Sequence, residues 1–183
     1  MQHTIGQFLG ILAAVASAIM PLYKKKWQML INTTAVNILV ASNLRLIGQV
    51  GSAVFLCSVA AVQCLVALLH NHRHTAPGKA ETLVFLCLYL FFGFFGMMTA
   101  PGFQWAINYR NLLELLPICG ALLSMVFVFI PDEQKARWVL LSTCSIWSVY
   151  TALVGSTAFF SQFISLIITV VALWKYRKTG RKH

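Results

Sequence analysis

Short clusters of charged side chains divide this chain into apolar stretches of about 20 residues. A helix of about 20 residues is long enough to cross the hydrocarbon core of a bilayer. Charged residues make up only 10% of the chain and apolar residues 59%, whereas soluble domains have about 25% and about 45–50%. The sequence therefore predicts an all-α, polytopic membrane protein and excludes an ordinary soluble domain.

Seven transmembrane helices are expected between the charge clusters. The second is the least apolar, because it contains several Asn, Thr and Ser side chains and Arg45. The first apolar run, 5–22, has no Lys or Arg before it and three lysines after it, so we expect a retained helix and not a cleaved signal peptide. The seven expected spans are 4–22, 28–46, 49–70, 81–99, 111–130, 137–154 and 158–174.

The positions of lysine and arginine predict the orientation of the chain. Basic residues in short loops concentrate on the cytoplasmic side of a membrane. With seven spans and the N-terminus outside, 12 of the 14 Lys and Arg residues are cytoplasmic, and only Arg45 and Arg110 are not. The C-terminus is then cytoplasmic as well. Because topology and anionic lipid account for the net charge of +10, nucleic acid is not an expected partner.

The lengths of the connections predict a 3+1+3 arrangement. Three spans with short connections are followed by one span between the two longest connections, and then by three more spans with short connections. This layout gives both triplets the same orientation, as in parallel transporter repeats. The expected units are a first triple-helix bundle at 1–75, a linker helix with its loops at 76–110, a second bundle at 111–174 and a basic cytoplasmic tail at 175–183.

The two triplets also share an order of sequence features. A constant shift of 110 residues aligns Pro21 with Pro131, each at the cytoplasmic end of the first helix of its bundle. These prolines indicate either a plain helix end or a hinge for gating, because proline removes a backbone N–H. The same shift aligns Asn37 with Trp147, on the polar second helix of each bundle.

Two stretches of the second half resemble a known family. They are ELLPICG at 114–120 and LSTCSIWSVYTALVGS at 141–156, followed by an apolar helix with an aromatic and basic tail. Over 111–180 the chain is similar to the YgjV family of bacterial inner-membrane proteins. The 3+1+3 layout and the two prolines resemble the SWEET, SemiSWEET and PQ-loop proteins. The resemblance implies a bacterial inner membrane and two triple-helix bundles with a sugar-like solute bound between them.

Polar side chains inside the spans are the candidate site residues, since such groups must find partners or line water. Asn37 supplies hydrogen bonds, and Trp147 with Tyr150 supplies an aromatic platform for a solute. The resemblance to sugar carriers adds Ser52 and Gln162, near the start of the last helix of each bundle. For all five residues, packing between helices remains the alternative to cavity lining.

Charged groups and cysteines favour neither catalysis nor metal binding. Arg110 and Glu114 have i, i+4 spacing, which favours an interfacial salt bridge over proton coupling. The histidines of 70–74 are expected to be solvated and not bound to metal. The five cysteines are far apart in apolar stretches, so we expect them to be free and buried. No enzyme motif is present, and no cofactor is expected.

The sequence predicts a small-solute facilitator or carrier whose two bundles rock about a pocket at the membrane midplane. The alternative is a scaffold, a receptor or a lipid-interacting protein on the same fold. The expected partners are the lipid bilayer and a small solute. A midplane cavity with converging polar groups favours a carrier, whereas a filled apolar centre favours the alternative.

Overall fold

Helices make up the regular secondary structure of the described part of the chain. The computed structural model describes residues 2–23, 25–49, 51–75, 78–130 and 133–176. The prediction of an all-α protein is confirmed for these residues, and one α-helix corresponds to each expected span. The helices are α1 (Gln2–Ile19), α2 (Lys26–Leu46), α3 (Ser52–Arg73), α4 (Lys79–Thr99), α5 (Tyr109–Phe129), α6 (Glu133–Leu153) and α7 (Ala158–Tyr176), with a short 3₁₀ helix, η1 (Met20–Leu22), after α1.

Five of these helices, α1, α3, α4, α5 and α7, are long and apolar enough to cross a membrane within the described residues. The other two, α2 and α6, contain more polar side chains. Both have 21 residues, which gives a length of about 31 Å. They therefore have the length of a membrane span although they are less apolar.

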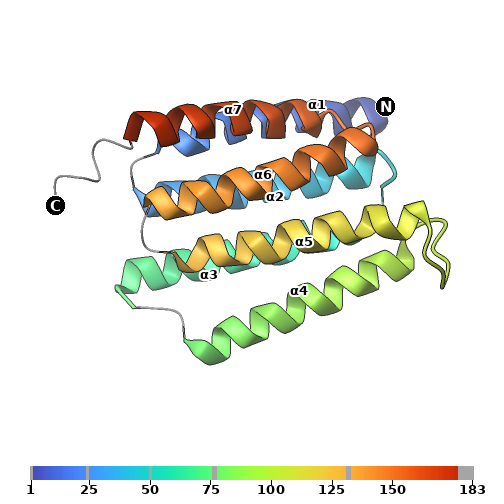
Figure 1. Ribbon diagram of the computed structural model, residues 1–183, viewed down its shortest axis with the longest axis horizontal. Helices are drawn as coiled ribbons and strands as arrows, with labels where there is room; N and C mark the ends of the chain where they lie inside the picture. Colours follow the sequence, from blue (N-terminus) through green and yellow to red (C-terminus); the bar gives the residue numbers. More distant parts are fainter. Residues whose placement is uncertain (1, 24, 50, 76–77, 131–132, 177–183) are drawn as a thin grey trace.

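Six helices form a closed ring of two layers (Figure 1). One layer contains α1, α2 and α3 side by side, and the other contains α7, α6 and α5. The layers join at two junctions, where α1 packs against α7 and α3 packs against α5. Helix α4 lies outside the ring and packs against both α3 and α5. The polar helices α2 and α6 are therefore the middle helices of the two layers.

The outer surface of this assembly is apolar, as expected where side chains meet lipid tails. Large exposed apolar side chains include Phe8 on α1, Phe91 on α4 and Val170 on α7. The prediction of buried cysteines is wrong for Cys87 and Cys119, because they lie on exposed faces of α4 and α5. The buried, free cysteines are Cys57, Cys64 and Cys144.

The turns after α2 and α6 resemble each other. Gly48 and Gly155 have positive φ angles of 84° and 70°, which favour glycine, and each follows the end of its 21-residue helix by the same interval. Aligning these glycines pairs Asn37 with Cys144, whereas the constant shift of 110 residues pairs Asn37 with Trp147. The two registers differ because the connection from α1 to α2 is longer than the connection from α5 to α6. The repeat itself stays a prediction.

Helix α4 is fixed to the junction between α3 and α5. Gly93 and Gly96 allow a close approach, and a Cβ at Gly96 would lie only 2.6 Å from the Cα of Ser52. Further along α4, the hydroxyl of the fully buried Tyr89 donates a 2.6 Å hydrogen bond to Oε1 of Gln63 on α3. A backbone contact and a buried hydrogen bond thus hold α4 against the ring.

Candidate functional site

A cavity lies inside the six-helix ring. About 80 Å³ is open to the centres of water-sized molecules, which is well above the minimum of about 10–15 Å³ needed to hold one water. Every ring helix contributes to the wall. The described residues of the wall include no Asp, Glu, Lys, Arg or His. They are Ser17, Met20, Thr33, Val36, Asn37, Val40, Leu56, Cys57, Ala60, Ala121, Ser124, Leu140, Thr143, Cys144, Trp147, Gln162 and Ser165.

Two hydroxyls and two amides of this wall have no hydrogen-bond partner among the described residues. The hydroxyls of Thr143 and Ser165 are buried and unpaired, and the amides of Gln162, which is buried, and Asn37, which is half-buried, make no hydrogen bond there either. By contrast, the hydroxyl of Thr33 donates to a carbonyl of its own helix, 2.7 Å away. Buried polar groups are nearly always paired once ordered water is counted. The buried groups of Thr143, Gln162 and Ser165 therefore indicate water or a polar solute in the cavity.

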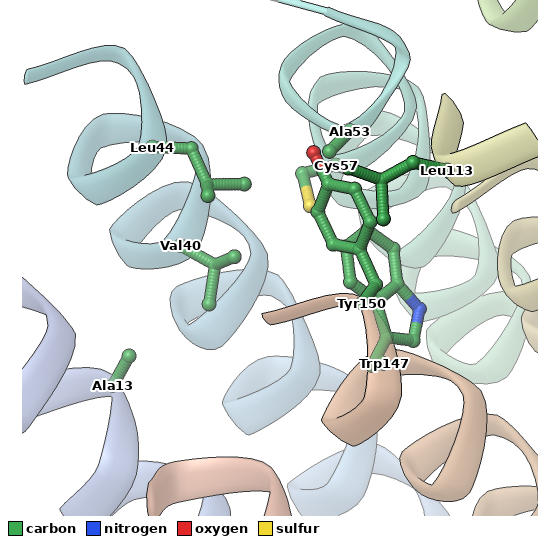
Figure 2. Close-up of a cluster of buried hydrophobic side chains, with 8 residues drawn as sticks. All are labelled: Ala13, Val40, Leu44, Ala53, Cys57, Leu113, Trp147 and Tyr150. Carbon is green, nitrogen blue, oxygen red and sulfur yellow. The ribbon is translucent and has the colours of Figure 1, made fainter. Parts of the chain in front are cut away.

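Apolar side chains close the cavity toward the end of the ring that carries the Gly48 and Gly155 turns, here called the Gly48 end. Trp147 and Tyr150 of α6 pack edge to face with ring centroids 5.9 Å apart, and they lie next to side chains of α3 and α5 (Figure 2). Both layers contribute to this cluster, which consists of Ala13, Val40, Leu44, Ala53, Cys57, Leu113, Trp147 and Tyr150.

A second apolar cluster lies toward the opposite end of the ring, here called the Lys26 end. The ammonium group of Lys26 on α2 donates a 3.1 Å hydrogen bond to the carbonyl of Ile130, which follows α5. This contact joins the two layers. The cluster beside it consists of Met29, Leu30, Cys64, Ala67 and Ala136. Packed apolar side chains therefore lie toward both ends of the ring.

A buried carboxylate joins α5 to α3 at the Gly48 end. Glu114 is only 1% exposed, and its Oε2 accepts hydrogen bonds from the backbone N–H of Ser52 at 2.9 Å and from the Ser52 hydroxyl at 2.7 Å. Its Oε1 lies 3.5 Å from Nη2 of Arg110. Gly51 leaves room for the carboxylate, since a Cβ there would lie 2.6 Å from Oε2. Glu114 thus caps the first turn of α3 with charge-assisted hydrogen bonds.

A buried amide joins the layers at the other junction. Asn43 of α2 is fully buried. Its Nδ2 donates to the carbonyl of Gly6 on α1 at 2.7 Å, and its Oδ1 accepts from the hydroxyl of Ser156, before α7, at 2.8 Å. Beside it, the hydroxyl of Thr157 donates to the side chain of Gln7 on α1. Both junctions therefore carry hydrogen bonds between the layers at the Gly48 end.

The structure brings three of the five sequence-predicted site residues together. Asn37, Trp147 and Gln162 line the same cavity from α2, α6 and α7. Tyr150 packs against Trp147 in the apolar cluster, and Ser52 is bound to Glu114 at the α3–α5 junction; neither lines the cavity. Solute binding by these residues stays a prediction.

The proline positions differ from each other. Pro21 lies in η1, after the end of α1, and Pro131 lies outside the described residues, so a hinge at either stays a prediction. Pro117 lies inside α5 and is fully buried. It removes one backbone hydrogen bond of α5, about one turn after Glu114. No role was predicted for Pro117, although a proline inside an expected span is a visible signal.

The structure also shows the contacts of the predicted ion pair, Arg110 with Glu114, and of His70 in the histidine segment. Arg110 and Glu114 do form an i, i+4 pair, but Glu114 is buried between helices and does not face the membrane surface. Nε2 of His70 lies 2.7 Å from Oε2 of Glu81, so this histidine connects the end of α3 to the start of α4. Among the described residues, no three His, Cys, Asp or Glu side chains are grouped as metal ligands.

Comparison with known families tests the resemblance noted in the sequence. The family model Imp-YgjV, described as "Bacterial inner membrane protein", matches residues 4–180, a segment that contains the whole cavity wall and the contacts of Glu114 and Asn43. Comparison with curated proteins and with solved structures gave no match. The predicted family is thereby confirmed over nearly the full chain, and the protein belongs to the Imp-YgjV family of bacterial inner membrane proteins.

Proposed function

We propose that this protein is a facilitator or carrier of small, uncharged solutes and that the cavity inside the ring is the solute site. The observation that carries the proposal is the set of unpaired amides and hydroxyls in the cavity wall, on Asn37, Thr143, Gln162 and Ser165. Amides and hydroxyls both donate and accept hydrogen bonds, so they suit polyols, sugars and amides. Since no described residue of the wall is charged, an uncharged solute avoids the cost of burying an unpaired ion.

The order of the helices supports two corresponding bundles, one for each layer of the ring. Helices α1, α2 and α3 occur in the same order around the ring as α5, α6 and α7, and the α3–α5 junction then corresponds to the α7–α1 junction. In this interpretation α4 is the linker that gives both bundles the same orientation. Rocking of such bundles about the central cavity opens it to one side and then to the other.

We assign the Gly48 end to the outside of the cell and the Lys26 end to the cytoplasm. This orientation follows from the tendency of Lys and Arg to stay on the cytoplasmic side. Arg45 and Arg110 lie at the Gly48 end. The Lys26 end carries the basic residues Lys25, Lys26, Arg73, Lys79, Lys135, Arg137 and Lys175.

Solute flux into proteoliposomes tests the proposal. Vesicles with the purified protein are mixed with a hyperosmotic solution of glycerol, xylitol, glucose or sucrose, and reswelling is followed by light scattering. We expect faster reswelling than in protein-free vesicles for at least one of the smaller solutes. Equal rates with and without protein for every solute would contradict a facilitator and favour a scaffold or a receptor.

Removing the cavity amides is expected to slow this flux. Asn37→Leu and Gln162→Leu each replace an amide with an apolar group of similar size, and each lost hydrogen bond is worth about 1 kcal/mol. The double variant should therefore lose flux at least about tenfold, since about 1.4 kcal/mol corresponds to a factor of ten. Ser145→Ala is the matched control, because Ser145 is exposed on α6 and donates to its own helix. Unchanged flux in the double variant would place the solute path elsewhere.

A further inference from the structure

We infer that the hydrogen bonds of Glu114 and Asn43 are the two latches of an outer gate, which must break before the cavity opens to the outside. This inference rests on the proposed function and adds the control of access to the same cavity. Each latch connects one layer of the ring to the other, and each lies at a different junction. Separating the layers at the Gly48 end therefore requires both latches to break.

The first latch is charge-assisted. Glu114 on α5 holds the backbone and the hydroxyl of Ser52 at the start of α3, and Arg110 completes its surroundings on the same helix. Hydrogen bonds to an ionised group are stronger than neutral ones. Pro117 lies between Glu114 and the cavity-lining Ala121 on α5. Because Pro117 removes a backbone hydrogen bond, the segment that carries the latch can tilt relative to the cavity wall.

The second latch is neutral. The hydroxyl of Ser156 donates to Oδ1 of Asn43, which links α2 to the start of α7 across 113 positions of the sequence. Gly10 allows this packing, since a Cβ there would overlap Oγ1 of Thr157 and would lie 3.0 Å from Nδ2 of Asn43. A neutral hydrogen bond of this kind is weaker than a charge-assisted one. Between the two latches lies the apolar cluster with Trp147 and Tyr150, which shares Val40, Cys57 and Trp147 with the cavity wall.

Two native cysteines on α3 provide the test. Cys57 lies in both the apolar cluster at the Gly48 end and the cavity wall, whereas Cys64 lies in the cluster at the Lys26 end. Each is kept as the only cysteine of the full chain, with the other four replaced by alanine. Intact cells are treated with a membrane-impermeant maleimide, and the rate of labelling from outside is measured.

The latch variants are expected to speed the labelling of Cys57. Glu114→Gln removes the charge but keeps the shape of the side chain, and Ser156→Ala removes the hydroxyl that reaches Asn43. Each change should raise the outside labelling rate at least about fivefold, because about 1 kcal/mol changes the population of an open state by that factor. Asn32→Leu is the matched control, since the Asn32 amide on α2 bonds to Ala16 within the same layer.

Two outcomes would overturn the inference. In the first, neither Glu114→Gln nor Ser156→Ala changes the labelling of Cys57. In the second, the labelling of Cys64 rises as much as that of Cys57, which shows general loosening and no gate at one end. Both readouts measure access and not transport, so the latches can fail while solute flux persists. If the unmodified protein carries no solute in the flux assay, the labelling result still stands.

Discussion

Glu114→Leu is expected to destabilise the protein by about 3 kcal/mol or more. The substitution leaves the N–H of Ser52 buried without its acceptor and leaves Arg110 without its carboxylate. The Ser52 hydroxyl keeps the backbone carbonyl of residue 114 as an acceptor at 2.9 Å. An unsatisfied buried donor costs about 1–3 kcal/mol, and removing one partner of a buried ion pair costs about 3–5 kcal/mol. Because Arg110 is 30% exposed, the lower part of that range applies. Unfolding of the purified protein by SDS, followed by circular dichroism, measures the change.

Glu81→Leu is the matched control for this measurement. Glu81 pairs with His70 at 2.7 Å, but both side chains are about one-quarter exposed, and exposed ion pairs contribute about 0–1 kcal/mol. The control should therefore unfold almost as the unmodified protein does. A similar loss in both variants, or no loss in Glu114→Leu, would show that the contact between α5 and α3 does not hold the ring together.

Gly96→Ala is expected to destabilise the packing of α4 by about 2–3 kcal/mol. The added Cβ would lie 2.6 Å from the Cα and 2.8 Å from the N of Ser52. These are backbone atoms of a helix that Glu114 holds in place, so the overlap is relieved only by moving α4 outward, and overpacking of this kind costs about 1–3 kcal/mol. Thermal unfolding in detergent should show a lower midpoint.

Gly93→Ala is the control at the same helix face. Its Cβ would lie 3.0 Å from Cγ1 of Ile118, a flexible side chain that can rotate away, and alanine gains about 1 kcal/mol of helix propensity over glycine. We expect a change below about 1 kcal/mol. Equal stability of Gly96→Ala and Gly93→Ala would contradict the close contact between α4 and the start of α3.

The helices were predictable because the features that define them are local. Apolar length and charge clusters mark each span in the sequence, so the seven helices correspond to the expected spans. The register between the two predicted bundles is not a local feature. It changes with the length of the connection between α1 and α2, which no hydropathy pattern reveals, and the glycine turns at Gly48 and Gly155 favour a register three residues away from the constant shift of 110 residues.

The candidate site was predictable only in part. Asn37, Trp147 and Gln162 were identified as polar or aromatic groups within spans, and all three line the cavity. Ser52 and Tyr150 belonged to the same class of residues, but their neighbours come from helices distant in sequence. These neighbours place Tyr150 in the apolar cluster at the Gly48 end and Ser52 at the α3–α5 junction. The burial of Glu114 likewise depends on its contact with the start of α3. The i, i+4 spacing of Glu114 and Arg110 concerns one helix only and does not reveal this contact.

The proposed solute site is tested most directly by an experimental structure in a lipid mesophase, at a resolution that shows ordered solvent. We expect non-protein density inside the ring, within hydrogen-bond distance of the amides of Asn37 and Gln162 and of the hydroxyls of Thr143 and Ser165. Soaking with a solute that passes the flux assay should change this density. A centre filled by side chains, with these four groups bonded to the protein, would contradict the proposed solute site.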